Sequence, residues 1–354
     1  MAKLFWFTLG VLLATSQAQT FLDSSTKSHY VSVSDNSSFV IGNFSVTPFY
    51  PDATEYSTPV PLFIVSPIKP GNYPVLLFIH GFALSNKYYS QLFNHIASHG
   101  FIVVAPQVTP VTLITIFTSL NQQPEIDTAA KVANWMPIHL PMVLQNYVTG
   151  VEGDLDKLAI SGHSRGGKSA FALALGFSNI KLQVTFSALI GVDPVAGVSV
   201  FRHNWQTYPY VLTNKPNSFN LSIPTTVIGS GLGDHGHFPC APNGLSHKEF
   251  YNECKKSSHF VITKYGHLQM LDDYTLPFTK IFCEYCSDSN DKMIKTVGGI
   301  MVAFLDNAYG IDDGGQYDGL LNGRLPFPTD VSVDNKNGYR QAYDPGFVAS
   351  YAQA

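Results

Sequence analysis

The chain has 354 residues, of which 45% are hydrophobic and 13% are charged. This composition excludes a disordered or fibrous protein, and the length allows one large domain or two smaller ones. The formal net charge is −4, with 21 basic against 25 acidic residues. The chain therefore lacks the basic surface that binding to nucleic acid requires.

Residues 1–18 have the layout of a secretory signal peptide. Lys3 supplies a positive charge, residues 4–14 form an apolar run, and Ser16 and Ala18 are small residues at a cleavage site. The run is too short to cross a bilayer, which takes about 20 residues. We expect the secretory pathway, with a plastid as the alternative. Sequons for N-glycosylation, usable in that pathway, begin at Asn36, Asn43 and Asn220.

After an extension at residues 19–46, short apolar runs alternate with segments of helical spacing. The runs are typical of strands buried on both faces and lie at residues 61–65, 75–79, 101–105, 157–160, 183–192, 225–229 and 259–263. Helices are predicted at residues 88–98, 127–136, 168–176 and 297–305. The alternation predicts an α/β domain at residues 47–310, with a mostly parallel central sheet flanked by helices. Residues 311–354 are rich in Gly, Asp and Asn, and we expect an extended tail there.

Ser164 is the candidate nucleophile. It lies in Ser-Gly-His-Ser-Arg-Gly-Gly at residues 161–167, which contains the common pattern Gly-x-Ser-x-Gly. Here a strand is predicted to end directly before the pattern and a helix to begin directly after it. That context is typical of the nucleophile elbow of an α/β-hydrolase, where Gly162 and Gly166 let neighbouring backbone approach the strained turn.

Acyl transfer also requires N–H donors for an oxyanion. The segment His80-Gly-Phe-Ala follows the strand predicted at residues 75–79. The backbone N–H groups of Phe82 and Arg165 are the predicted donors, with Ala83 as the alternative to Phe82. We expect His80 to orient this loop.

The general base should follow both the serine and the acid in the chain. Among the histidines after Ser164, His267 is preferred because it lies in a turn just past a late strand. Two acids are candidates: Asp193, in a turn made rigid by Pro194, and Asp234, in a loop rich in Gly and His. Asp193 is preferred because a triad acid must stay fixed against its imidazole.

The four cysteines are Cys240, Cys254, Cys283 and Cys286. Pairing Cys240 with Cys254 would close a loop of about 15 residues, which is worth roughly 3 kcal/mol, and we predict that disulfide. The sequence leaves open whether Cys283 and Cys286 pair. Their spacing provides no second close pair for zinc, so we expect no metal.

Four parts of the sequence together resemble the chlorophyllases, plant enzymes that cleave the phytyl ester of chlorophyll. They are residues 161–168, residues 189–197, residues 239–242 with 247–254, and residues 265–273. The resemblance runs from about residue 47 to residue 308. It implies an α/β-hydrolase fold, a triad of Ser164, Asp193 and His267, no cofactor, and chlorophyll or a related phytylated tetrapyrrole as substrate. A secreted lipase or polyester hydrolase, and a non-catalytic binding protein, are the alternatives.

An uncharged stretch at residues 100–123 includes a segment that follows a strand at the edge where such sheets bind ligands. Four threonines and Pro110 at residues 108–120 argue against a buried helix, and a phytyl chain needs an apolar wall. We expect a substrate site, with a peripheral membrane contact, lined by Leu113, Ile114, Ile116 and Phe117.

Overall fold

A computed structural model describes residues 37–110, 120–200, 203–236, 239–275, 283–311 and 315–336. The predicted signal peptide, the sequon at Asn36 and the residues 113–117 predicted to line the substrate site lie outside these ranges.

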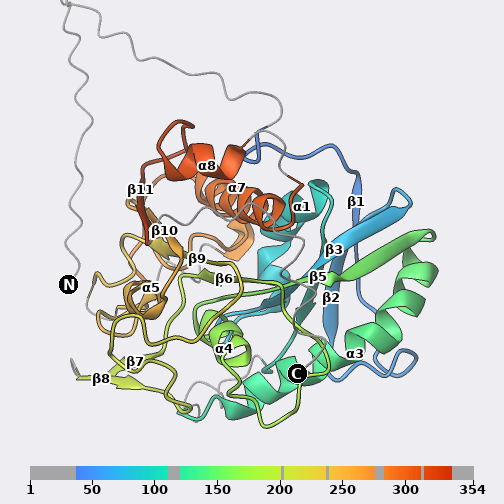
Figure 1. Cartoon of the computed structure of the whole chain (residues 1–354), viewed down its shortest axis with the longest axis horizontal. Coiled ribbons are helices and arrows are strands. Elements are labelled where there is room, and N and C mark those ends of the chain that lie inside the picture. The colour runs from blue at the N-terminus through green and yellow to red at the C-terminus, as the bar shows by residue number, and fades with distance from the viewer. Residues whose placement is uncertain are drawn as a thin grey trace, which may run out of the picture. The chain divides into compact units, whose positions relative to one another are not determined.

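A mostly parallel sheet organises the described residues, with helices on both faces (Figure 1). Its strands, in spatial order, are β1 (Val46–Phe49), β2 (Leu62–Pro67), β4 (Ile102–Pro106), β3 (Gly71–Ile79), β5 (Val151–His163), β6 (Ala188–Val192), β9 (Thr225–Ser230), β10 (Ser258–Ile262) and β11 (Val331–Asn335). The pairs from β4 to β10 are parallel. The edge pairs β1–β2, β2–β4 and β10–β11 are antiparallel. The predicted α/β-hydrolase class is confirmed.

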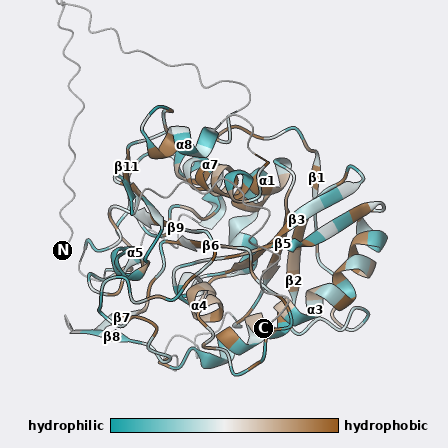
Figure 2. Ribbon diagram, viewed as in Figure 1, coloured by the Kyte–Doolittle hydropathy of each residue, from teal (hydrophilic) through white to brown (hydrophobic). Residues whose placement is uncertain are grey.

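The sheet is buried on both faces because alternate side chains of each strand enter different cores. In β3, Val75 and Leu77 enter one core, whereas Leu76 and Phe78 enter the other. The first core is covered by α3 (Gln123–Tyr147), α4 (Arg165–Ala174) and α5 (His247–Glu253). The second is covered by α1 (Ser90–Ser98), α7 (Asn290–Ala308) and α8 (Gln316–Leu321). Hydrophobic residues follow the strands at the centre of the sheet in Figure 2.

The chain past residue 310 differs from the predicted tail in its described part. Residues 315–336 contain α8 and β11, and β11 adds an antiparallel strand to the sheet beside β10. Val331 and Val333 pack against the second core, while Ser332 between them is exposed. Among the described Gly and Asp residues of this part, Asp318 and Gly319 lie within α8 and Asp334 lies within β11.

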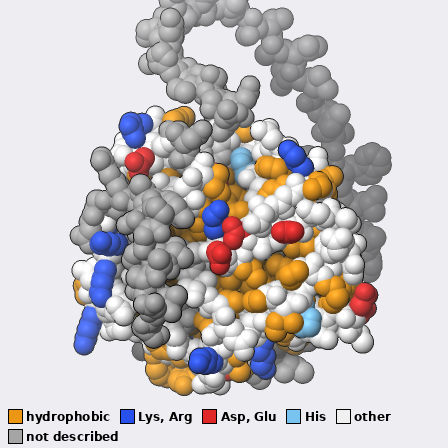
Figure 3. All heavy atoms as spheres, turned by 45° about the vertical axis from the view of Figure 1, so that its right-hand side comes forward, with side chains coloured by type: hydrophobic (Ala, Val, Ile, Leu, Met, Phe, Trp, Pro, Cys, Tyr) orange, Lys and Arg blue, Asp and Glu red, His pale blue; other side chains and the backbone are white. Residues whose placement is uncertain are grey.

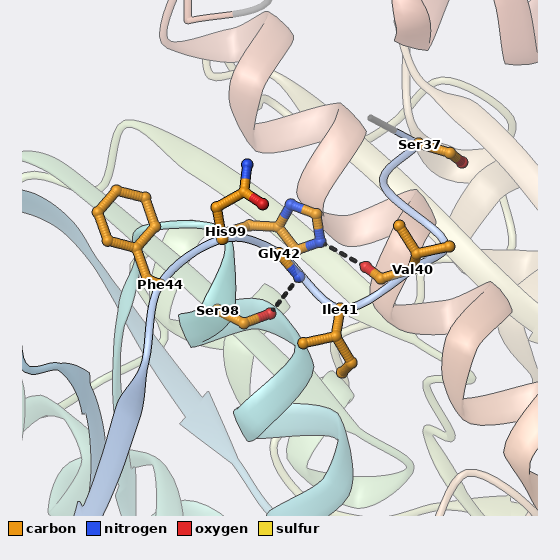
Figure 4. A pocket seen from close by; sticks show the side chains of 8 residues that line it. Ser37, Val40, Ile41, Gly42, Phe44, Ser98 and His99 are labelled. Carbon is orange, nitrogen blue, oxygen red and sulfur yellow. Dashed lines mark hydrogen bonds between the residues drawn. The ribbon is translucent and has the colours of Figure 1, made fainter. Parts of the chain in front are cut away.

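Several hydrogen bonds tie the segment before β1 to the end of α1, and Figure 4 draws two of them. Gly42 N donates to Ser98 Oγ at 2.8 Å, and His99 Nε2 donates to Val40 O at 2.9 Å. A cavity of about 260 Å³ lies here, and its lining includes none of the predicted catalytic residues. Asn43, which also lines this cavity, is exposed, and so is Asn220.

The predicted Cys240–Cys254 disulfide is wrong. Cys240 pairs with Cys283, with a Cα–Cα distance of 5.6 Å, and Cys254 is a buried free thiol. The reason is that Cys254, the residue after α5, is buried in the first core, whereas Cys240 meets Cys283. Burial raises the pKa of the Cys254 thiol to about 12, so it stays protonated. Cys286 is also a free thiol.

A separate two-stranded antiparallel sheet is formed by β7 (Gly197–Val200) and β8 (His203–Gln206). The 3-10 helices are η1 (Asn86–Tyr89) and η2 (Asp273–Thr275). Among the described residues, no helix combines the length and apolar character needed to cross a membrane.

Candidate active site

Ser164 occupies a strained turn between β5 and α4. Its φ of 58° and ψ of −125° place it in a region that non-glycine residues rarely adopt. The turn needs small neighbours: a Cβ on Gly162 would lie 2.3 Å from Gly166 O, and one on Gly166 would lie 2.1 Å from Ile79 O. These contacts explain both glycines of the pattern and give Ser164 the geometry of a nucleophile elbow.

Ser164, His267 and Asp193 form a continuous line of hydrogen bonds. Ser164 Oγ lies 2.8 Å from His267 Nε2, and His267 Nδ1 lies 2.8 Å from Asp193 Oδ2. All three side chains are buried. With a proton on Nδ1, the imidazole donates to the carboxylate and leaves Nε2 free to accept from the serine hydroxyl.

Asp193 is held as an anion inside the protein. Burial alone would raise the pKa of its carboxyl, but the attraction and hydrogen bond of His267, together with a hydrogen bond from Ser230, lower it to about 2. The turn is fixed by backbone bonds, because Asp193 N donates to Ile228 O at 2.6 Å. Asp234, the alternative acid, lies 2.9 Å from Lys248 Nζ instead, so the structure brings only Asp193 to His267.

Two side chains around Asp193 were not predicted from the sequence. Ser230, the last residue of β9, donates its hydroxyl to Asp193 Oδ2. His247 Nε2 lies 4.0 Å from Asp193 Oδ1, and His247 Nδ1 lies 2.7 Å from His259 Nε2. His247 lies in residues 247–254, one of the parts that resemble the chlorophyllases, but the resemblance assigned no role to it.

The loop after β3 packs against the elbow. A Cβ on Gly81 would lie 3.2 Å from Ser164 Cβ, so Phe82 follows a residue in direct contact with the nucleophile turn. His80 fixes the loop, since its Nε2 accepts from Val108 N at 3.1 Å. Burial lowers the pKa of His80 to about 4, which keeps that nitrogen available as an acceptor. The predicted oxyanion donors Phe82 and Arg165 thus belong to adjoining turns.

The charged side chains of the motif serve to hold neighbouring segments. Arg165 Nε donates to both carboxylate oxygens of Glu125, at 2.9 and 2.8 Å, in a buried ion pair. Lys168 Nζ donates to Thr207 Oγ1 at 2.8 Å. Burial and the charge of Arg165 lower the pKa of Lys168 to about 7. Both cations thus have partners outside the nucleophile turn, and the backbone N–H of Arg165 stays a predicted oxyanion donor.

The fold and this site together define an α/β-hydrolase of the serine esterase class. The family model for chlorophyllase matches residues 34–337, well over half of the sequence and more than the predicted domain at residues 47–310. The chain belongs to the chlorophyllase family.

Individual relatives support the same assignment. The chain is 57% identical over 363 aligned residues to "Chlorophyllase type 0" of Chenopodium album, with 100% of both chains covered. It is 43% identical to "Chlorophyllase-1" of Arabidopsis thaliana, covering 78% of this chain and 85% of that one. It is 45% identical to "Chlorophyllase-1, chloroplastic" of Citrus unshiu, covering 71% and 73%.

Proposed function

We propose that the chain is a serine esterase that cleaves the phytyl ester of chlorophyll to chlorophyllide and phytol. The observation that carries the proposal is the line of hydrogen bonds from Ser164 through His267 to Asp193. The names of the relatives supply the substrate, since each is called a chlorophyllase.

The proposed reaction is acyl transfer in two steps. Ser164 Oγ attacks the ester carbonyl while His267 Nε2 takes its proton, and Asp193 stabilises the imidazolium. The N–H groups of Phe82 and Arg165 stabilise the oxyanion. Phytol leaves with the proton from His267, and water activated by the same base then releases chlorophyllide. The magnesium of the pigment belongs to the substrate.

Replacement of the nucleophile or the base tests this mechanism. We expect Ser164→Ala and His267→Ala each to lower kcat by roughly 10³-fold or more, because triad members act as a unit. His235→Ala is the control, since that side chain is 57% exposed and its imidazole contacts Asp234. Chlorophyllide release is measured by absorbance after phase separation. A folded Ser164→Ala protein that keeps a tenth of wild-type turnover would contradict the mechanism.

The substrate separates this proposal from its nearest alternative. A lipase or polyester hydrolase would use the same three residues on a different ester. Paired assays with chlorophyll and a triglyceride distinguish the two, and activity on a p-nitrophenyl ester distinguishes any esterase from a binding protein. Preference for the triglyceride would favour the lipase.

We also propose that Leu113, Ile114, Ile116 and Phe117 line the apolar part of the substrate site and contact the membrane that holds the pigment. The support is the uncharged composition of residues 100–123 together with the phytyl chain of the substrate. Replacing Ile116 and Phe117 with Ser should raise KM for chlorophyll and spare a short p-nitrophenyl ester. Parallel loss of both activities and of thermal stability would place the segment in the core instead.

The compartment is a separate proposal. Two Citrus relatives are named chloroplastic, which supports the plastid alternative and gives no support to the secretory pathway expected from residues 1–18. Glycosylation at Asn36, Asn43 and Asn220 belongs to the secretory route. Imaging of a C-terminal fluorescent fusion, with glycosidase treatment of the purified protein, decides between the two.

A further inference from the structure

A buried line of hydrogen bonds joins the predicted oxyanion loop to the turn that carries the base. Gly81 N donates to Tyr89 Oη at 3.0 Å, and Tyr89 Oη lies 2.8 Å from His163 Nδ1. His163 Nε2 lies 3.1 Å from the carbonyl oxygen of His267. Tyr89 and His163 are each 0% exposed. The line therefore runs from the residue before Phe82 to the backbone of the general base.

The two ends of the line fix the direction of every hydrogen bond in it. A backbone N–H can only donate and a carbonyl oxygen can only accept. His163 must therefore carry a proton on Nε2, which it donates to His267 O. Burial, and then the charge of His267, lower the pKa of His163 well below its usual range, so Nδ1 is unprotonated and accepts from the Tyr89 hydroxyl. The same hydroxyl oxygen accepts from Gly81 N.

Packing around the line leaves its members little room to move. The His163 and His267 rings lie 4.6 Å apart, and the Tyr89 ring stacks on Phe93 at 5.8 Å. Tyr89 also ends η1, and the next residue, Ser90, donates its N–H to Asp272 Oδ2 at 3.1 Å. The helix start that carries Tyr89 is thus bound to the segment after His267 by a second path.

We propose that Tyr89 and His163 are positioning residues that hold the oxyanion donors and His267 in a fixed relation to Ser164. The inference rests on the proposed esterase mechanism. Both parts of that machinery must meet the same carbonyl group, one at its oxygen and the other at the attacking and leaving oxygens. His163 precedes the nucleophile directly, so one residue of the elbow connects the two loops on either side of it.

The expected result of breaking the line is a loss in kcat rather than in KM. Tyr89→Phe removes only the hydroxyl, leaving Gly81 N–H without its acceptor and His163 Nδ1 without its donor. His163 can then take the other tautomer and release the His267 carbonyl. We expect kcat on a short p-nitrophenyl ester to fall about 10-fold to 100-fold, in line with the effect of small misplacements at a reacting centre, with KM nearly unchanged.

Tyr317→Phe is the matched control. Tyr317 is also 0% exposed, but it belongs to α8, and its hydroxyl is hydrogen-bonded to Ser258 at the start of β10, away from the site. Both variants should lose thermal stability, and only Tyr89→Phe should lose kcat per active site, counted by titration with a phosphonate ester. Equal kcat in the two variants would overturn the inference.

Substitutions of His163 give an independent test that does not depend on Tyr89→Phe folding. A Gln amide can reach the Nε2 position and donate to His267 O, whereas an Asn amide reaches only the Nδ1 position. We expect His163→Gln to keep more kcat than His163→Asn, and Tyr89→Phe to have a smaller effect when added to His163→Asn than alone. Higher kcat in His163→Asn, or fully additive losses, would contradict the proposal. Wild-type protein without any esterase activity would overturn the proposed function as well.

Discussion

Asp193 shows at the scale of one residue how the site keeps a buried carboxylate charged. Its carboxyl is buried, yet the imidazole of His267 and the hydroxyl of Ser230 outweigh the penalty and keep its pKa near 2. The φ of Asp193 is 40°, a strained value that the backbone bond to β9 sustains. A residue in such a position has a conformation set by its surroundings rather than by its own preference.

Removing that charge should be far more damaging than removing the charge of Asp234. Asp193→Asn keeps the shape but favours the wrong tautomer of His267, and we expect kcat to fall by about 10⁴-fold, as in other serine triads. Asp234→Asn removes only the partly exposed charge that contacts Lys248 and His235, and it should leave kcat nearly unchanged. Steady-state kinetics on a p-nitrophenyl ester checks the ranking, and the reverse order would move the acid to Asp234.

The sequence identifies residues that carry the reaction better than residues that hold them. Ser164, Asp193 and His267 were found because each follows a predicted strand in the chain order of the fold. Ser230 and Tyr89 were not, because a serine at a strand end or a tyrosine before a helix has no distinctive pattern. Their roles depend on contacts between residues far apart in the chain. Ser230 contacts Asp193, and Tyr89 contacts His163. Only the folded backbone determines these contacts.

At the scale of elements, α3 shows that local sequence signals alone do not determine where a helix ends. The sequence predicts a helix at residues 127–136, yet α3 runs from Gln123 to Tyr147 and contains Pro137 and Pro141. Proline removes a hydrogen bond inside a helix and normally ends it. Here both prolines are exposed, while Leu140, Val143 and Leu144 bury an apolar face against the sheet. Burial of that face outweighs the lost backbone bonds.

The cysteines give a second example, because sequence spacing is a poor guide to contact between elements. Cys240 and Cys283 are 43 residues apart, and closing a loop of that length is worth about 4 kcal/mol in the chain-entropy model. Cys283→Ser should therefore lower the unfolding free energy by up to about that amount. Denaturant titration gives the value.

Peptide mapping without reduction tests the pairing itself. It should recover Cys240 linked to Cys283, while Cys254 reacts with an alkylating reagent only after unfolding, because its side chain is buried. Cys254→Ser is the matched variant, and it should leave the cross-linked peptide unchanged. A peptide joining Cys240 to Cys254 would restore the pairing predicted from the sequence.

At the scale of the whole molecule, the fold class followed from strands whose two faces are both apolar. Such strands require helices on both faces of the sheet. The two cores, one on each face of the sheet, satisfy that requirement. Charged side chains are only 13% of the sequence, and they are sparse among the apolar and uncharged side chains on the face shown in Figure 3. Stability therefore rests mainly on burial, and several histidines are buried with the apolar residues.

These buried histidines predict a loss of stability in mild acid. Burial lowers the pKa of His80 and of His95 to about 4 and that of His259 to about 3. Below about pH 6.5 the unfolded chain binds protons at these residues and the native protein does not. The unfolding free energy therefore decreases as the pH decreases. The slope is about 1.4 kcal/mol per pH unit for each histidine, until the pH reaches its native pKa. Three such groups together can remove much of the stability of an ordinary domain.

His95→Gln isolates one histidine of this set. The His95 ring donates Nε2–H to Ser38 O at 2.7 Å, and a glutamine amide can make the same hydrogen bond without taking up a proton. Urea titrations at about pH 7 and about pH 5 should show a smaller decrease in unfolding free energy for His95→Gln than for the wild type, by about the share of one histidine. His235→Gln, at an exposed position, should leave the decrease unchanged. Equal decreases in all three proteins would show that His95 binds its proton as readily in the folded protein as in the unfolded chain, and acid sensitivity would then have to arise from other groups.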